Sequence, residues 1–351
     1  MKRQRWMLKA VPAGLIAASL LITGGCGLFS KQASTEIDPP PAGLQENSKA
    51  IEEGQALQQG EGSQLTVYLK DGNGYIAPVT LSVPLNGDKK PEQVALEAMV
   101  AEGPYAGQLP EGFKPVLSKG TVIKKVDIVK DQELAVVDLN EHFTDYNVPD
   151  ERRIVEAVTW TLTSFPDVKQ VELWQEGEKL SEMPVDGFPL THALTRDIGI
   201  NLERAEGVDL ARSTPVTLYF SSLTPADTQY YVPVTRLIER SDDIAAAAMK
   251  ELISGPGSSS HLTSVMTQDL EVGSIEIKKD VITVDLRDQS YKDGQPMPSE
   301  MIQSVILSLT ENTGANKVQI QLNGSGNVKD TDNRSYSEPV DRPVYVNAIK
   351  S

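Results

Sequence analysis

Two aspartates recur in matching sequence contexts and are the first candidates for chemistry in this chain. Asp138 lies in AVVDLN and Asp285 lies in ITVDLR. A carboxylate at such a position could act in acid–base catalysis or bind a cation, but an aspartate at the end of a strand can also hydrogen-bond to the turn that follows it. We favour the structural interpretation for both residues, because their repetition weakens the catalytic one.

The other reactive side chains form no catalytic or metal-binding motif. The three histidines, His142, His192 and His261, are scattered along the chain, whereas a metal site needs several ligands close together. The sequence contains no H-E-x-x-H, no G-x-x-x-x-G-K and no C-x-x-C, so the common zinc, phosphate and redox motifs are missing. We therefore expect no metal, no cofactor and no enzymatic activity.

Both aspartates belong to a long internal repeat that must position them. LTVYL at Leu65 corresponds to VTLYF at Val216, and YIAPVT at Tyr75 corresponds to YYVPVT at Tyr230. Further matches keep the same order, and the differences in length fall between them, as expected for loops in two copies of one fold. A period of about 150 residues is too long for a solenoid, so the sequence predicts two tandem domains.

Each copy predicts the element order β-β-α-β-β-α-β. The elements expected in the first copy are strands over 65–70 and 75–84, a helix from Pro91 to Gly103 and Pro104, strands over 121–129 and 133–139, a helix from Pro149, and a closing strand in VKQVELW. The first helix of the second copy ends at the matching Gly255 and Pro256. Two amphipathic helices can cover one face of a mixed or antiparallel sheet, so we expect two homologous α+β domains of this kind.

Length and charge limit the functions of this chain. Its 351 residues suffice for two domains, and its net charge of −16 argues against binding to nucleic acid. Residues 27–64 are rich in Gln, Glu, Ser and Pro, a composition typical of a flexible tether. The expected divisions are a signal peptide over 1–25, a tether over 26–64, a first domain over 65–195, a linker over 196–213 and a second domain over 214–351.

The N-terminal segment resembles the signal of a bacterial lipoprotein. Basic residues precede VPAGLIAASLLIT, an apolar run of 13 residues that is too short to span a bilayer. The following TGGC contains Cys26, the only cysteine, and resembles a lipobox, although Thr23 stands where leucine is usual. The resemblance implies that Cys26 carries a lipid that anchors the protein to the membrane. The alternatives are a general secretory signal with an incidental cysteine and an uncleaved short anchor.

The repeated blocks resemble the GerMN-domain family of sporulation and germination lipoproteins. The resemblance rests on AEGP with ISGP, on VVDLN with TVDLR, and on TWTLTSFPDVKQVELW, and it covers about 65–190 and 215–346. It implies an envelope protein of endospore-forming bacteria on the extracytoplasmic face of the cell membrane, in the intermembrane space of the sporulating cell. It also implies a core similar to that of ring-building modules, and hence partners among other sporulation envelope proteins, including ring-forming ones.

The function expected on this basis is non-enzymatic assembly of an envelope complex in spore formation and germination. Two other classes of function stay open. A peptidoglycan enzyme would need a cleft that contains a perturbed acid pair. A solute-binding lipoprotein of a transporter would need two doubly wound lobes with parallel sheets.

Two tryptophans of the first copy have no aromatic counterpart in the second and are candidate partner-binding residues. Trp174 lies on the same strand face as Glu172 and corresponds to Gln321. Trp160 corresponds to Leu307 and lies away from the main apolar stripe of its helix. Either tryptophan could anchor a partner or could pack against the second domain.

Overall fold

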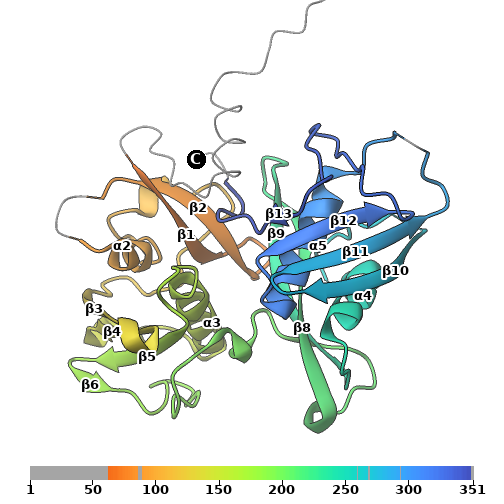
Figure 1. Cartoon of the computed structure of the whole chain (residues 1–351). Coiled ribbons are helices and arrows are strands. Elements are labelled where there is room, and N and C mark those ends of the chain that lie inside the picture. The colour runs from red at the N-terminus through yellow and green to blue at the C-terminus, as the bar shows by residue number, and fades with distance from the viewer. Residues whose placement is uncertain (1–61, 86–88, 259, 268, 293, 349–351) are drawn as a thin grey trace, which may run out of the picture. The chain divides into compact units, whose positions relative to one another are not determined.

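The computed structural model describes residues 62–348, except for 86–88, 259, 268 and 293 (Figure 1). The expected signal peptide, Cys26 and almost all of the expected tether lie outside the described residues. Both repeats belong to one compact unit of the chain, and one cluster of buried apolar side chains extends through both of them.

The first repeat has the predicted order of elements. They are β1 (Ser63–Lys70), β2 (Ile76–Val83), α2 (Pro91–Glu97), β3 (Ile123–Val129), β4 (Leu134–Leu139), α3 (Glu151–Leu162), β5 (Gln170–Gln175) and the short β6 (Glu178–Lys179). Strands β1 and β2 form an antiparallel hairpin. The other four strands form a mixed sheet in the order β3-β4-β5-β6, in which β4 and β5 are parallel.

The second repeat follows the same plan. Its elements are β8 (Ser213–Leu223), β9 (Gln229–Glu239), α4 (Ile244–Ser254), β10 (Leu270–Lys278), β11 (Val281–Asp288), α5 (Ser299–Thr313), β12 (Lys317–Leu322) and β13 (Val340–Asp341). The mixed sheet has the order β10-β11-β12-β13. Short 3-10 turns connect the elements of the chain, at Ala106–Gln108, Lys130–Gln132, Glu141–Thr144, Val148–Asp150, Arg196–Ile198 and Leu210–Arg212.

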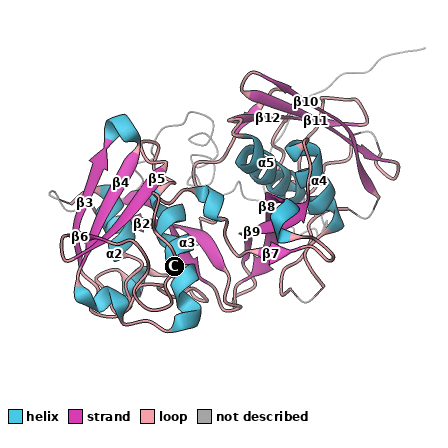
Figure 2. Ribbon diagram, turned by 90° about the horizontal axis from the view of Figure 1, so that it is seen from below, coloured by secondary structure: helices cyan, strands magenta, loops and turns pink. Residues whose placement is uncertain are grey.

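The helices of each repeat lie between the hairpin and the mixed sheet (Figure 2). Helix α3 contacts β1 and β2 on one side and β5 on the other, and α5 contacts both β8 and β12. The α+β class and the element order are therefore confirmed, but the hairpin forms a sheet of its own. A side chain of the helix occupies the edge of β1 that faces away from β2. Tyr68 N–H donates to Thr161 Oγ1 of α3 there (2.9 Å). Tyr219 N–H donates in the same way to Ser308 Oγ of α5 (3.0 Å).

The strands bury the side chains that their alternating pattern predicts. The inward residues of the two central strands are Ala135, Val137 and Leu139 in β4 and Ile282, Val284 and Leu286 in β11, all of them buried. Apart from the buried Leu134 at the start of β4, their outward neighbours are polar or only partly covered. Each mixed sheet therefore has one face in the core and one open face.

The first helix ends differently in the two repeats, so the prediction from Gly103 and Pro104 was wrong. Helix α4 runs to Ser254 and Gly255 caps it with φ 83°, whereas α2 already ends at Glu97. The chain leaves the helix there because Met99 O accepts the N–H groups of two residues in the loop at 116–117. The backbone that would extend α2 therefore binds this loop.

The segment expected to be a linker is part of the folded structure. Within residues 196–213, the strand β7 (Glu203–Arg204) pairs in parallel with β9 and so extends the hairpin sheet of the second repeat. The chain after the first repeat thus adds a strand to the second.

We expect Thr161→Val to lower the free energy of unfolding by about 1–3 kcal/mol, because it leaves the buried Tyr68 N–H without an acceptor. Thr159→Val is the matched control on the same helix. Thr159 is fully buried and its Oγ1 has no hydrogen-bond partner among the described residues, so this change should be neutral or stabilising. Urea unfolding of both variants measures the difference, and equal losses would contradict the role assigned to Thr161.

Candidate functional site

The repeated aspartates hold turns in place. Asp138 Oδ1 accepts the N–H of Gly177 (2.9 Å), and Asp285 Oδ1 accepts the N–H of Gly324 (2.8 Å). In each repeat the bound turn follows the neighbouring parallel strand, and not the strand that carries the aspartate. The two carboxylates therefore tie adjacent strand ends together.

Trp160 is not an exposed partner anchor, because it is only 1% exposed. Its Nε1–H donates to the carbonyl of Gly199 (3.0 Å), and the guanidinium of Arg196 lies 4.4 Å from the centroid of a Trp160 ring. Trp160 also contacts the Tyr68 ring at a centroid distance of 5.7 Å. The large indole is thus buried between Tyr68 of its own repeat and residues 196–199, which belong to the segment expected to be a linker.

Trp174 lies on the open face of the mixed sheet of the first repeat, which we define by Val136 and Asp138 of β4 and Gln170, Glu172 and Trp174 of β5. The register places Trp174 between Asp138 and Lys179. Its ring is half-buried, and its Nε1–H points to Glu172 Oε2 (3.4 Å). Lys179 binds the other oxygen of Glu172 (2.6 Å). The neighbouring polar groups therefore hold the indole in one orientation on an accessible surface.

An ion cluster that the sequence analysis missed lies where the repeats meet. Arg196 donates to both carboxylate oxygens of Glu311 in α5 (2.9 Å each), and Arg342 donates to Glu311 Oε2. Tyr219 O–H donates to the same oxygen (3.0 Å). Glu311 thus holds together an arginine that follows each repeat. One feature of the sequence could have revealed this cluster. The spacing Arg-x-x-x-x-Asn occurs after each repeat and ends in Asn201 and in Asn347.

The ionisation of Glu311 follows from this arrangement. Burial by itself would raise the pKa of the carboxyl, but the positive charges of Arg196 and Arg342 lower it to about 2. The pKa of Glu156 shifts in the other direction. Burial raises it, and this effect outweighs the lowering by the N–H of Asn201 and the guanidinium of Arg152. Glu311 is therefore charged in the folded protein at neutral pH.

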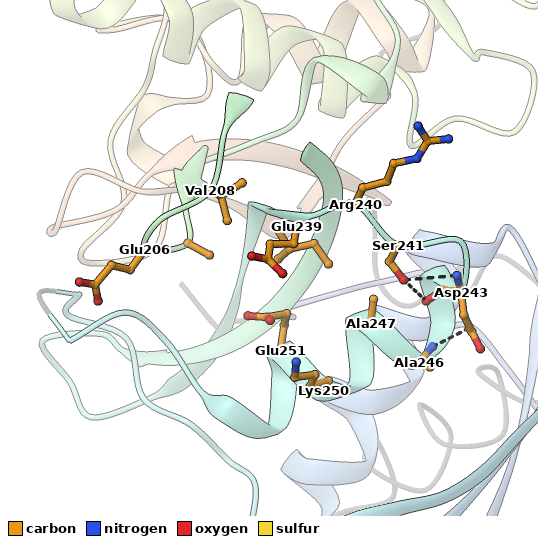
Figure 3. Close-up of a pocket in the computed structure, with 12 residues that line it drawn as sticks. Glu206, Val208, Glu239, Arg240, Ser241, Asp243, Ala246, Ala247, Lys250 and Glu251 are labelled. Carbon is orange, nitrogen blue, oxygen red and sulfur yellow. Dashed lines mark hydrogen bonds between the residues drawn. The ribbon is translucent and has the colours of Figure 1, made fainter. Parts of the chain in front are cut away.

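The surface hollow in Figure 3 has a volume of about 480 Å³ and lies between α4 and the end of β9. Figure 3 shows the carboxylates of Glu239 and Glu251 at its centre, whereas Arg240 extends away from them. Glu251 accepts from Arg236 (3.0 Å). Asp243 Oδ1 accepts the N–H of Ala246 (2.9 Å) and caps α4. Two of the acidic groups here are thus engaged in structural contacts.

A second hollow, of about 590 Å³, lies beside Glu156 and Glu203. Both oxygens of Glu156 are bound, one by Arg152 Nε (2.7 Å) and the other by the N–H of Asn201 (3.0 Å). Glu203 binds Arg236 (2.6 Å). These carboxylates face a cavity, but each of them already has an arginine partner.

The three histidines lie apart from one another on the surface or in loops of the first and second repeats. In the part of the chain that the structure describes, no group of three or more His, Cys, Asp and Glu side chains is placed to hold a metal ion. His142 pairs with Asp145 on the surface (2.9 Å). Among the same residues, no helix is long and apolar enough to cross a membrane.

The lowered pKa of Glu311 predicts a loss of stability in acid. A carboxyl with a pKa near 2 in the folded state and 4.5 when free stabilises the fold above pH 4.5, and this contribution disappears as the pH falls toward 2. The loss should be on the order of 3 kcal/mol. Glu311→Gln should be less stable than the parent at pH 7, and the difference should shrink at low pH.

Chemical unfolding between pH 2 and pH 7 checks this prediction. The control is Glu338→Gln, since Glu338 is exposed, and it should change stability little at any pH. A constant difference between Glu311→Gln and the parent over the whole range would contradict the assigned charge state.

Comparison with known proteins identifies the relatives of this chain. The sequence is 36% identical to the spore germination protein GerM of Bacillus subtilis (strain 168), over 97% of this chain and 99% of that protein. The structure is similar to the solved tandem GerMN domains of the sporulation protein GerM from Bacillus subtilis, with a TM-score of 0.75 and 37% identity over 81% of this chain and 99% of that one. The model of the family described as "Germane: Sporulation and spore germination" matches residues 66–181 and 217–327. The chain therefore belongs to the Germane family of sporulation and spore germination proteins.

Proposed function

We propose that this protein is an extracytoplasmic lipoprotein, anchored in the membrane through Cys26, that acts without catalysis as an assembly component of an envelope complex in spore formation and germination. The relationship to a spore germination protein over nearly the whole chain supports the cellular process. The apolar run followed by TGGC supports the anchor. Its partners would be other envelope proteins of the sporulating cell, including ring-forming ones.

The observation that carries the assembly role is the half-buried Trp174 on the open face of the first repeat. Large aromatic side chains that are held rigidly at a surface contribute strongly to protein interfaces, because they cover much area and lose little entropy. Glu172 and Lys179 restrict this indole through their contacts. The matching position in the second repeat is Gln321, so the two open faces are not equivalent.

The state of the carboxylates favours this proposal over a peptidoglycan enzyme. Such an enzyme needs one carboxyl that donates a proton and another that stays ionised, both free to reach the substrate. Glu156 has a raised pKa, but Arg152 and the N–H of Asn201 occupy its two oxygens. The proposal is therefore a binding function, exerted through the open face.

Trp174→Ala should impair spore formation or germination and should change the free energy of unfolding by less than about 1 kcal/mol, since the ring lies outside the core. Gln321→Ala is the matched control at the same position of the second repeat. Spore yield, germination rate and thermal unfolding should be measured for both variants. The proposed docking face is wrong if both variants behave like the parent.

Cys26→Ala should move the protein from the membrane fraction to the soluble fraction or leave an unprocessed precursor, because lipid attachment needs the thiol and the acidic chain has little attraction for anionic lipid. Thr23→Leu is the control, since it introduces the usual lipobox residue and should keep the protein in the membrane. Fractionation of cells followed by immunoblotting provides the measurement. Unchanged membrane retention of Cys26→Ala would argue against the lipid anchor.

A further inference from the structure

The matching strands β2 and β9 of the two repeats contact each other, yet they do not belong to one sheet. Each strand carries a proline, Pro78 or Pro233, in its repeated Tyr-x-x-Pro block. Proline has no N–H to donate and prevents regular pairing at its position. The backbone groups along this junction must therefore find other partners.

Asn201, which follows the first repeat, supplies one set of partners. Its Oδ1 accepts the N–H of Ile76 (2.8 Å), and its Nδ2 donates to the carbonyls of Ile76 and Pro233 (2.7 Å each). One amide side chain thus binds β2 and β9 at the same time. Asn201 has a φ of 47°, a left-handed conformation that asparagine tolerates better than most residues.

Asn347, which follows the second repeat, supplies the reciprocal set. Its Oδ1 accepts the N–H of Tyr231 (2.8 Å), and its Nδ2 donates to the carbonyls of Tyr231 (2.7 Å) and Pro78 (2.8 Å). Tyr231 and Pro78 are the repeat equivalents of Ile76 and Pro233. Asn347 also has a positive φ, of 56°. The two asparagines are therefore equivalent clamps, one from each repeat.

The segments that carry these clamps are exchanged between the repeats. We call residues 196–201 the first strap and residues 342–347 the second strap. In the first strap, Ile200 O accepts the N–H of Thr235 in β9 (2.8 Å). In the second strap, Val346 O accepts from Thr80 Oγ1 of β2 (2.9 Å), and Asn347 O accepts from Thr80 N–H (3.2 Å). Each repeat is thus closed by backbone of the other.

The straps also begin at equivalent residues. Arg196 and Arg342 each stand five residues before the clamp asparagine, and both bind the single carboxylate of Glu311. Each guanidinium also lies near an aromatic ring of its own repeat, Trp160 for Arg196 and Tyr219 for Arg342. A displacement of one strap therefore disturbs the ion cluster that holds the other.

We propose that the two straps form a coupling device, through which the second strap controls the order of β2 in the first repeat and the first strap controls β9 in the second. Release of either strap by a partner, a protease or a mutation then loosens a hairpin that lies far away in the sequence. The two repeats consequently act as one cooperative unit and not as independent modules. This coupling does not depend on which partner the open face binds.

Amide hydrogen exchange on the full chain tests the proposal with Asn347→Gly. Glycine tolerates the positive φ, so this variant removes the clamp without adding backbone strain. Exchange at Thr80 and its neighbours in β2 should rise about tenfold or more, because buried hydrogen bonds are lost there. Asn201→Gly should produce the reciprocal increase at Thr235 in β9. The control is Asn333→Gly, since Asn333 is exposed and has a φ of 65°, and it should leave both strands protected.

A milder variant covers the case in which Asn347→Gly unfolds. Thr80→Val removes the side-chain bond to Val346 (2.9 Å) and a longer one to Thr66 Oγ1 within the same hairpin (3.4 Å). It should speed the exchange of Tyr231 N–H in the second repeat through the loosened strap. The proposal would be overturned if each variant, Asn347→Gly and Thr80→Val, raised the rate of amide exchange only within the repeat that carries the substitution. Increases in β2 for Asn347→Gly and at Tyr231 for Thr80→Val would support it.

Discussion

The junction between β2 and β9 must satisfy backbone groups that cannot pair with one another, and much of the structure follows from this constraint. Each strand carries a proline, which has no N–H to donate, and a buried carbonyl or N–H without a partner costs about 1–3 kcal/mol. Asn201 and Asn347 meet the requirement because an amide side chain offers both a donor and an acceptor. To bring these amides into place, the chain after each repeat must cross to the hairpin of the other.

The ion cluster around Glu311 also holds the two straps in place, through electrostatic attraction. Breaking a buried ion pair by removal of one partner is costly, because the remaining charge keeps its desolvation penalty. Two arginines share one carboxylate here, so neither strap can leave without disturbing the other. The aromatic rings of Trp160 and Tyr219 lie next to these guanidinium groups, which adds a favourable cation–π contribution.

This internal use of polar groups shapes what the protein can do. The repeated aspartates bind turns, Glu156 binds a strap residue and an arginine, and Glu311 joins the repeats. The open face of the mixed sheet in the first repeat carries the partly exposed Trp174, whereas the matching position in the second repeat is Gln321. The two repeats therefore share one plan but differ in the side chains that they present on their open faces.

The sequence alone determined the repeat, the order of the elements and the alternation of buried residues in strands such as β4, because these features depend on local patterns of apolar and polar side chains. It also assigned Asp138 and Asp285 to structural roles. It did not show that α2 ends at Glu97, since a loop more than ten residues further along the chain competes for its backbone. It left the role of Trp160 open and treated residues 196–213 as a connector. Only the tertiary structure decided these points, because contacts between residues far apart in the chain are set by the packing of the two repeats and leave no local pattern.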